Sequence, residues 1–193
     1  MNITVYLGSV SGCDAKYDKA AAELGAWIAD NGHTLVYGGA KRGMMGALSS
    51  AALARGGKVI GVIPAVASIR ARIKKDITQL IETDSMAERR AEMIRLGDAF
   101  IAMPGGPGTL EEITEVISCC RLGLVDAPCI LYDLDGYYDH LKAHFVKMRR
   151  EGFLEQGLDR VCFLQTAEEL FAKLQERADE LADNGAGRIN SPL

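Results

Sequence analysis

This 193-residue chain lacks most of the features that mark specialised classes of protein. Its five cysteines are odd in number and show no paired spacing of the kind that binds a metal. Its net charge of −4 gives no general surface for nucleic acid or for a membrane. No apolar run is long enough to span a bilayer, and the N-terminal MNITVYLGS lacks the basic and apolar regions of a signal peptide. We therefore expect a cytoplasmic protein with reduced core thiols, and no metal, bound cofactor, nucleic-acid partner or membrane partner.

The composition is that of an ordinary globular protein, with 48% hydrophobic and 25% charged residues. This length suits a single domain with a sizeable core. Strand-like and helix-like apolar patterns alternate as far as residue 182, whereas the C-terminal NGAGRINSPL has neither pattern. We predict one domain over residues 1–182 and a flexible tail over residues 183–193.

The alternation predicts the fold class, because strands that alternate with helices of this length form βαβ units and a parallel sheet. We expect a Rossmann-like, doubly wound α/β domain with a mostly parallel sheet of about seven strands and helices on both faces. The expected strands are Ile3–Leu7, Thr34–Tyr37, Lys58–Ile63, Gln79–Glu82, Ala99–Ala102, Cys129–Tyr132 and Val161–Leu164. The expected helices are Lys16–Asn31, Met44–Arg55, Met86–Leu96, Leu110–Leu122, Tyr137–Glu151 and Glu168–Ala182.

The most informative segment is Met103 to Glu112, MPGGPGTLEE. It follows an apolar run that predicts a strand and precedes an apolar periodicity that predicts a helix. Free N–H groups and the positive end of the helix dipole meet at such a helix N-terminus, and glycines let a phosphate approach closely. The segment therefore predicts a phosphate site at Gly105, Gly106 and Gly108, with Glu112 about one turn away.

Two further glycine-bearing loops follow predicted strands, Gly8 to Gly12 and Gly38 to Gly43. The loops after the strands of an open parallel sheet gather at one edge, where ligands bind. Together the glycine loops predict a phosphorylated ligand of nucleotide size. Lys41 and Arg42 in the second loop either contact its phosphate or are simply solvated.

Glu112 has two interpretations. Thr109-Leu110-Glu111-Glu112 fits a capping box, with Thr109 as N-cap, and similar patterns stand at Ser85 and at Thr166. Alternatively, Glu112 is a functional carboxylate beside the phosphate site. A cap does not need the preceding Pro-Gly-Gly-Pro-Gly, so the glycines favour the functional interpretation.

Arg89 and Arg90 also have two interpretations. In isolation, their charged helix is typical of a solvated face. Because this helix follows a predicted strand, its first turn also points at the ligand-binding edge of the sheet. Arginines at that place are suited to a phosphate or a leaving group.

These residues match the pattern of a known family. The chain resembles the cytokinin-activating phosphoribohydrolases of the LONELY GUY type, part of a superfamily often labelled lysine decarboxylase-like. The family pattern P-G-G-x-G-T-x-x-E stands here as Pro104 to Glu112. The resemblance runs from Val5 to about Leu154 and includes Met86 to Met93 with its two arginines, Gly38 to Gly46, Val59 to Pro64, and Asp135-Gly136-Tyr137-Tyr138.

The resemblance implies hydrolysis of the N-glycosidic bond of adenine-type nucleoside 5′-monophosphates, which gives a free base and ribose 5-phosphate. It implies that Glu112 stabilises the positive ribose and orients or deprotonates water, and that Arg89 holds the geometry and offsets charge. The substrate-binding residues implied by the match are Gly8, Ser9, Gly39, Met86, Arg90, Gly105, Gly106, Pro107, Gly108, Thr109, Leu110, Glu111 and Ser118.

Several residues depart from the family pattern. Pro107 replaces an aromatic residue often seen inside the glycine loop, and Arg90 stands where the family has Lys. Ala71 stands where plant relatives have a Glu that contacts the substrate. The choice between plain AMP and an N6-substituted base therefore stays open.

Two other functions compete with this one. Decarboxylation with pyridoxal phosphate needs a lysine at the carbonyl site, and Lys41, the nearest candidate, is not placed as a Schiff base. A non-enzymatic carrier is the second alternative, because molybdenum-cofactor carrier proteins have this fold and a similar glycine loop. The pairing of Arg89 with Glu112 favours the hydrolase.

The family also implies a homodimer, and the helix after the glycine loop agrees with it. Ile113, Val116, Ile117 and Cys120 fall on one stripe that suits the sheet, while Glu112, Glu115 and Cys119 fall on another. We expect the second stripe to face the ligand near a twofold axis, so that the partner subunit completes the pocket.

Overall fold

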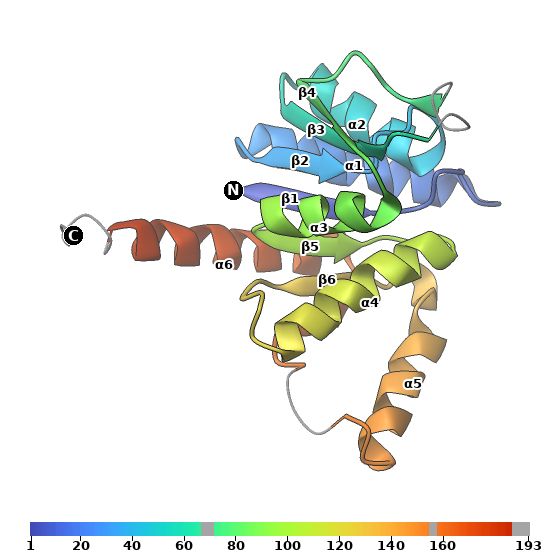
Figure 1. Ribbon diagram of the computed structural model, residues 1–193, viewed down its shortest axis with the longest axis vertical. Coiled ribbons are helices and arrows are strands. Elements are labelled where there is room, and N and C mark those ends of the chain that lie inside the picture. Colours follow the sequence, from blue (N-terminus) through green and yellow to red (C-terminus); the bar gives the residue numbers. More distant parts are fainter. Residues whose placement is uncertain (67–71, 155–157, 187–193) are drawn as a thin grey trace.

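The computed structural model describes residues 1–66, 72–154 and 158–186. In this part of the chain, all seven strands are parallel and form one sheet in the order β4-β3-β2-β1-β5-β6-β7 (Figure 1). The strands are β1 (Asn2–Tyr6), β2 (Thr34–Tyr37), β3 (Lys58–Pro64), β4 (Gln79–Thr83), β5 (Ala99–Ala102), β6 (Cys129–Tyr132) and β7 (Val161–Leu164). The α/β Rossmann-like prediction is confirmed.

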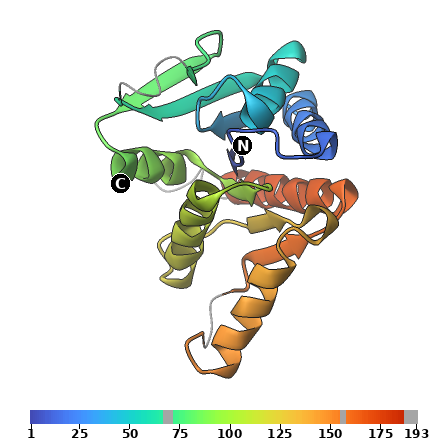
Figure 2. The ribbon, with the colours of Figure 1, turned by 90° about the vertical axis from the view of Figure 1, so that its right-hand side faces the viewer.

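Helices cover both faces of the sheet (Figure 2). Helices α1, α2 and α6 pack on one face, while α3, α4 and α5 pack on the other. The helices are α1 (Ala15–Asp30), α2 (Gly43–Ala54), α3 (Met86–Leu96), α4 (Pro107–Arg121), α5 (Asp139–Arg150) and α6 (Ala167–Ala186), with a short 3₁₀ turn, η2 (Leu134–Gly136).

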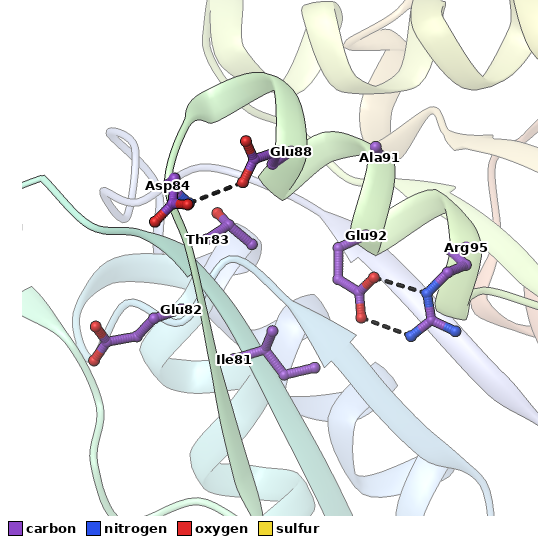
Figure 3. A pocket seen from close by; sticks show the side chains of 8 residues that line it. All are labelled: Ile81, Glu82, Thr83, Asp84, Glu88, Ala91, Glu92 and Arg95. Carbon is purple, nitrogen blue, oxygen red and sulfur yellow. Dashed lines mark hydrogen bonds and ion pairs between the residues drawn. The ribbon is translucent and has the colours of Figure 1, made fainter.

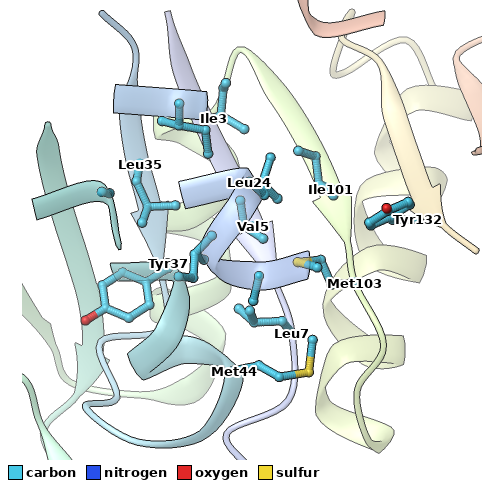
Figure 4. Packing of buried hydrophobic residues seen from close by; sticks show 14 of the residues in the cluster. Ile3, Val5, Leu7, Leu24, Leu35, Tyr37, Met44, Ile101, Met103 and Tyr132 are labelled. Carbon is cyan, nitrogen blue, oxygen red and sulfur yellow. The ribbon is translucent and has the colours of Figure 1, made fainter. Parts of the chain in front are cut away.

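The core follows from the alternation of side chains along each strand. Ile3, Val5 and Leu7 point toward α1 and α2, where Leu24 and Met44 meet them (Figure 4). The intervening side chains of β1 and β5 enter the opposite layer, which α3 and α4 close. Because β1 and β5 are covered on both faces, the loops that follow them have a rigid base.

The strand order reverses at β1. Strand β2 pairs with one edge of β1 and β5 pairs with the other, so the chain continues in opposite directions from the centre of the sheet. This reversal leaves a crevice at the carboxyl ends of β1 and β5, where doubly wound folds bind their ligands. The backbone N–H of Gly8 donates to the carbonyl of Pro104 at 3.2 Å and joins the two loops there.

The expected elements all form, and most ends agree to within one or two residues. Helix α4 begins earlier than expected, at Pro107, and α6 continues past Ala182 to Ala186, while residues 187–193 of the expected tail lie outside the described residues. The prediction of core thiols is right for Cys129 but wrong for Cys13, which is exposed on the loop after β1. No helix in the described ranges has the length and apolar character that crossing a membrane requires.

Candidate active site

The glycine loop after β5 leads directly into α4. Gly106 is the N-cap and Pro107 takes the first helical position, where its fixed φ suits the helix and its missing N–H costs nothing. Within the described chain, the backbone N–H groups of Gly106 and Gly108 donate to no backbone carbonyl, whereas that of Thr109 donates to Gly106 at 3.0 Å. The loop therefore presents free donors at the positive end of a helix, which suits an anion.

The capping-box interpretation of Glu112 is wrong. Because α4 begins at Pro107, Thr109 lies inside the first turn, and Glu112 lies beyond it. The two similar patterns are real caps: Ser85 Oγ accepts from the N–H of Glu88, and Thr166 Oγ1 accepts from the N–H of Glu169. Because Gly106 is the N-cap of α4, Glu112 is not at the N3 position and does not cap the helix.

Glu112 instead faces Arg89 across the crevice. Nη1 of Arg89 donates to Oε1 of Glu112 at 2.8 Å, and Nε of Arg89 donates to the carbonyl of Val62 at 3.0 Å. The two residues are only 7% and 5% exposed. The pair therefore ties α3 to α4 and to the carboxyl end of β3, at the level of the glycine loops.

Burial and the arginine act on Glu112 in opposite directions. Burial raises the pKa of the Glu112 carboxyl, and the charge and hydrogen bond of Arg89 lower it, with burial the larger effect. Burial, followed by the charge of Glu112, also raises the pKa of the neighbouring Tyr6. A buried carboxylate with a raised pKa, next to an anion site, is typical of a functional group rather than a surface charge.

Arg90 belongs to a second, more exposed set of charges. It donates to Glu115 at 2.6 Å and pairs with Glu111 at 3.0 Å, and these contacts raise its pKa. Arg90 and Glu111, which the resemblance to the family assigns to the substrate site, therefore pair with each other on the outer side of α3 and α4. Their pairing supports the position of α3 relative to α4.

Two consecutive tyrosines brace the glycine loop from the far side. Tyr138 Oη donates to the carbonyl of Met103 at 2.7 Å, and Tyr137 Oη donates to that of Gly105 at 2.6 Å. The N–H of Tyr138 in turn donates to the buried Asp133 carboxylate at 2.5 Å. Since a peptide unit is planar, the contact of Tyr137 also sets the direction of the Gly106 N–H.

A cavity of about 200 Å³ opens beside Arg89. Its walls come from the loops after β1, β2 and β3 and from the start of α3. Arg89 itself is held over Gly38, where a Cβ atom would collide with its Nη2. The lining residues are Ser9, Gly38, Gly39, Ala40, Met45, Ile63, Pro64, Arg72, Ile73, Met86 and Arg89. This mostly apolar space next to a guanidinium suits a planar base.

A larger cavity of about 600 Å³ adjoins it. It shares Ser9, Ala40 and Arg72 with the first cavity and adds Val10, Ser11, Arg42 and Gly43. Arginines are its sole charged lining residues within the described chain.

A separate hollow of about 480 Å³ lies between α3 and the edge strand β4 (Figure 3). The carboxylates of Glu82, Asp84, Glu88 and Glu92 line it, and its Arg95 is already paired with Glu92 at 2.7 Å. This negative hollow repels a phosphate, so the ligand site lies on the Arg89 side of α3.

The other residues predicted for the site fall into two groups. Ser9, Gly39 and Met86 line the cavity with Arg89, Gly8 donates to the carbonyl of Pro104, and Gly105 packs against the hydroxyl of Thr109. Leu110 and Ser118 instead are exposed and line neither cavity, and Ser118 Oγ donates to the carbonyl of Thr114 at 2.8 Å. Within a single chain, these two residues do not contact the Arg89 cavity.

The sequence predicts Gly38 only as part of a glycine loop and gives no role to Tyr137 or Tyr138, although all three stand in segments that resemble the family. Ala71, which replaces the family's substrate-contacting Glu, lies outside the described residues.

Known proteins identify the family. A family model described as "Possible lysine decarboxylase" matches residues 45–174. The cytokinin riboside 5′-monophosphate phosphoribohydrolase LOG of Oryza sativa subsp. japonica is 42% identical over 92% of this chain and 74% of its own length. The enzyme of the same name from Rhodococcoides fascians is 42% identical over 79% of this chain and 78% of its own length.

The protein is a member of the LONELY GUY family. Solved structures of more distant proteins have the same fold. The molybdenum cofactor carrier protein of Chlamydomonas reinhardtii gives a TM-score of 0.72 at 21% identity, covering 92% of this chain and 98% of that one. The molybdenum cofactor binding protein of Rippkaea orientalis gives 0.69 at 23% identity, covering 91% and 95%. At these identities the likeness concerns the fold alone.

Proposed function

We propose that this member of the LONELY GUY family hydrolyses the N-glycosidic bond of adenine-type nucleoside 5′-monophosphates, and releases the free base and ribose 5-phosphate. The observation that carries the proposal is the buried ion pair of Arg89 and Glu112 beside the open N-terminus of α4. The named activity of relatives that are 42% identical supports it.

The geometry suits the charges of this reaction. The 5′-phosphate binds the free N–H groups of Gly106 and Gly108, which places the ribose near Glu112. Cleavage of the bond between C1′ and the base leaves positive charge on the ribose, and the electron pair departs with the base. The Glu112 carboxylate stabilises that positive charge and orients the water whose oxygen attacks C1′, while a proton of this water is finally taken up with the base.

Arg89 acts on both sides of this bond. It fixes the Glu112 carboxylate through its Nη1 and borders the apolar cavity that receives the base. A guanidinium at that place favours the negative charge that develops on the departing base. Ser9, Gly39 and Met86 complete the wall around the base.

Base release is the direct test. The protein is incubated separately with AMP, isopentenyladenosine monophosphate and adenosine, and the free base is measured. We expect release from at least one monophosphate and a much lower rate with adenosine, because the nucleoside cannot use the phosphate site. Equal rates on AMP and adenosine would contradict the role of the glycine loop.

The alternatives have weaker support. No lysine of the described residues lines either of the two cavities near Arg89, and Lys41 is exposed, so nothing provides a desolvated amine for pyridoxal phosphate. A cofactor band at about 400 nm in the purified protein would favour the decarboxylase. A pterin retained through purification would favour a function as a molybdenum-cofactor carrier. Such carriers resemble this chain in the fold.

We further propose a cytoplasmic homodimer in which the partner subunit completes the pocket. Leu122 and Leu124, after the end of α4, are 74% and 72% exposed, and such apolar side chains favour burial in an interface. Ser118 and Leu110 lie on the exposed side of the same helix, where a partner's ligand would reach them. Light scattering should give about twice 20.8 kDa. A monomer mass in an active preparation would exclude the dimer.

A further inference from the structure

The larger cavity beyond the base site is lined by positively charged side chains that the reaction on plain AMP does not use. It adjoins the base cavity, because Ser9, Ala40 and Arg72 line both. Its charged lining residues in the described chain, Arg42 and Arg72, come from two different loops. The cavity therefore extends the base site with a cationic wall.

The backbone holds these two loops together. The N–H of Lys41 donates to the carbonyl of Arg72 at 2.8 Å, the N–H of Lys74 donates to that of Gly39 at 2.9 Å, and Ala40 and Ile73 form an antiparallel bridge. The loop that carries Arg42 also packs closely on the loop after β1. Gly43 has a φ of +61° and leaves no room for a Cβ beside the Ser9 carbonyl. The positions from which both arginines project are therefore fixed.

The charges of Arg42 and Arg72 are not neutralised within the described chain. Arg89, Arg90 and Arg95 each contact a carboxylate, whereas neither arginine of the larger cavity forms an ion pair with the described residues. Both side chains are exposed and keep their guanidinium groups available to a ligand. Two planar guanidinium groups in the lining of one cavity suit a carboxylate or another oxyanion.

The order of the subsites decides which part of a ligand reaches this wall. The phosphate binds at the start of α4, C1′ lies at Glu112, and the base occupies the cavity beside Arg89. The larger cavity, which shares Ser9, Ala40 and Arg72 with the base cavity, is then the space open to a substituent of the base. We propose, on the basis of the function proposed above, that this protein prefers nucleoside 5′-monophosphates whose base carries an anionic substituent, which Arg42 and Arg72 bind.

Two analogues of equal size test this preference. N6-carboxymethyl-AMP carries a carboxylate, and N6-carbamoylmethyl-AMP carries a neutral amide of the same shape. We expect kcat/KM for base release to be about fivefold to tenfold higher for the acid, as befits contacts with two partly hydrated guanidinium groups. The ratio should decrease in high salt, because salt screens exposed charges.

Variants assign the preference to the two arginines. In the Arg42→Gln, Arg72→Gln double variant, the ratio of acid to amide should fall to about one. The matched control is Arg55→Gln, which removes an exposed arginine at the end of α2, outside both cavities, and should keep the native ratio. A native ratio near one, or a high ratio that survives the double substitution, would overturn the proposal.

Two further measurements separate this inference from its alternatives. ADP is compared with AMP, and a preference for ADP that depends on the same arginines would overturn the assignment to the base and place the second anion on the phosphate chain. Calorimetric binding of both analogues tests the subsite independently of hydrolysis. If base is released from AMP but the acid and amide bind and react alike, this inference fails while the proposed function stands. If no nucleotide is hydrolysed, the proposed function fails, and the binding ratio still decides whether the subsite exists.

Discussion

Arg89 and Glu112 are twenty-three positions apart in sequence, and their side chains meet at 2.8 Å in a buried ion pair. Arg89 comes from the first turns of α3 and Glu112 from the second turn of α4, on the same face of the sheet. Taking one partner away from such a pair leaves a buried charge without compensation. The same contact therefore joins the packing of the two helices to the chemistry proposed for the site.

The first prediction concerns pH. Burial raises the pKa of Glu112, and the ionised carboxylate is the form that stabilises positive charge. As the pH is lowered, kcat/KM should therefore fall with a midpoint above the usual pKa range of glutamate. Since the pKa is raised in the folded state, protonation favours folding, and this contribution to the free energy of unfolding is lost as pH rises through the raised pKa. A pH–rate profile from about pH 4 to about pH 9 measures the acid limb.

Arg89 determines how far the acid limb of the pH–rate profile is shifted, because it lowers the pKa of Glu112. Because Arg89 lowers the pKa of Glu112, Arg89→Gln should move the acid limb to still higher pH, besides reducing the rate. Arg95→Gln, which removes an exposed arginine of the same helix, should leave the limb in place. An unchanged limb in Arg89→Gln would show that the profile does not report Glu112.

The second prediction tests the support of Arg89 by Gly38. A methyl group at Gly38 collides with Nη2 of Arg89 and with Met45, so Gly38→Ala should displace the guanidinium and lower kcat/KM by about tenfold or more. A double-mutant cycle provides the control. In the Arg89→Gln background, Gly38→Ala should have little further effect, because the displaced group is already absent. Additive losses would mean that Gly38 acts by another route.

The third prediction concerns the tyrosine brace. Tyr137→Phe removes the hydrogen bond that directs the Gly105–Gly106 peptide, so KM for AMP should rise several-fold with a smaller change in kcat. Tyr138→Phe leaves the buried Met103 carbonyl without this donor and should cost about 1–3 kcal/mol of stability. Tyr132→Phe is the control, since it alters a tyrosine of β6 outside this brace. A fall in kcat alone in Tyr137→Phe would argue against a role in phosphate binding.

Much of this arrangement could be predicted from the sequence, because it depends on local patterns. Alternating apolar periods predict the strands and helices, and glycines directly after strands predict the ligand-binding edge. The apolar periodicity begins at Leu110 and therefore predicts the start of α4 too late, whereas Pro107 and Gly108 already have helical backbone. That shift decides between a cap and a functional carboxylate for Glu112.

Contacts between distant segments could not be predicted in the same way. The sequence does not show that Arg89 reaches the Val62 carbonyl and lies over Gly38, or that Arg90 turns outward to Glu115. Nor does it show that Arg42 and Arg72 line one cavity, since that depends on the bridge between Ala40 and Ile73. Such details require the packing of side chains in three dimensions.

The charge of Glu112 is the centre of this account, and Glu112→Gln tests it most directly. Glutamine keeps an oxygen that accepts the Arg89 hydrogen bond, so the variant should stay folded. It loses the negative charge that the proposed reaction needs. Release of base from AMP or isopentenyladenosine monophosphate should fall by about a hundredfold or more. Glu115→Gln, on the same helix, is the matched control and should retain most of the activity. Near-native turnover in a folded Glu112→Gln protein would contradict the account.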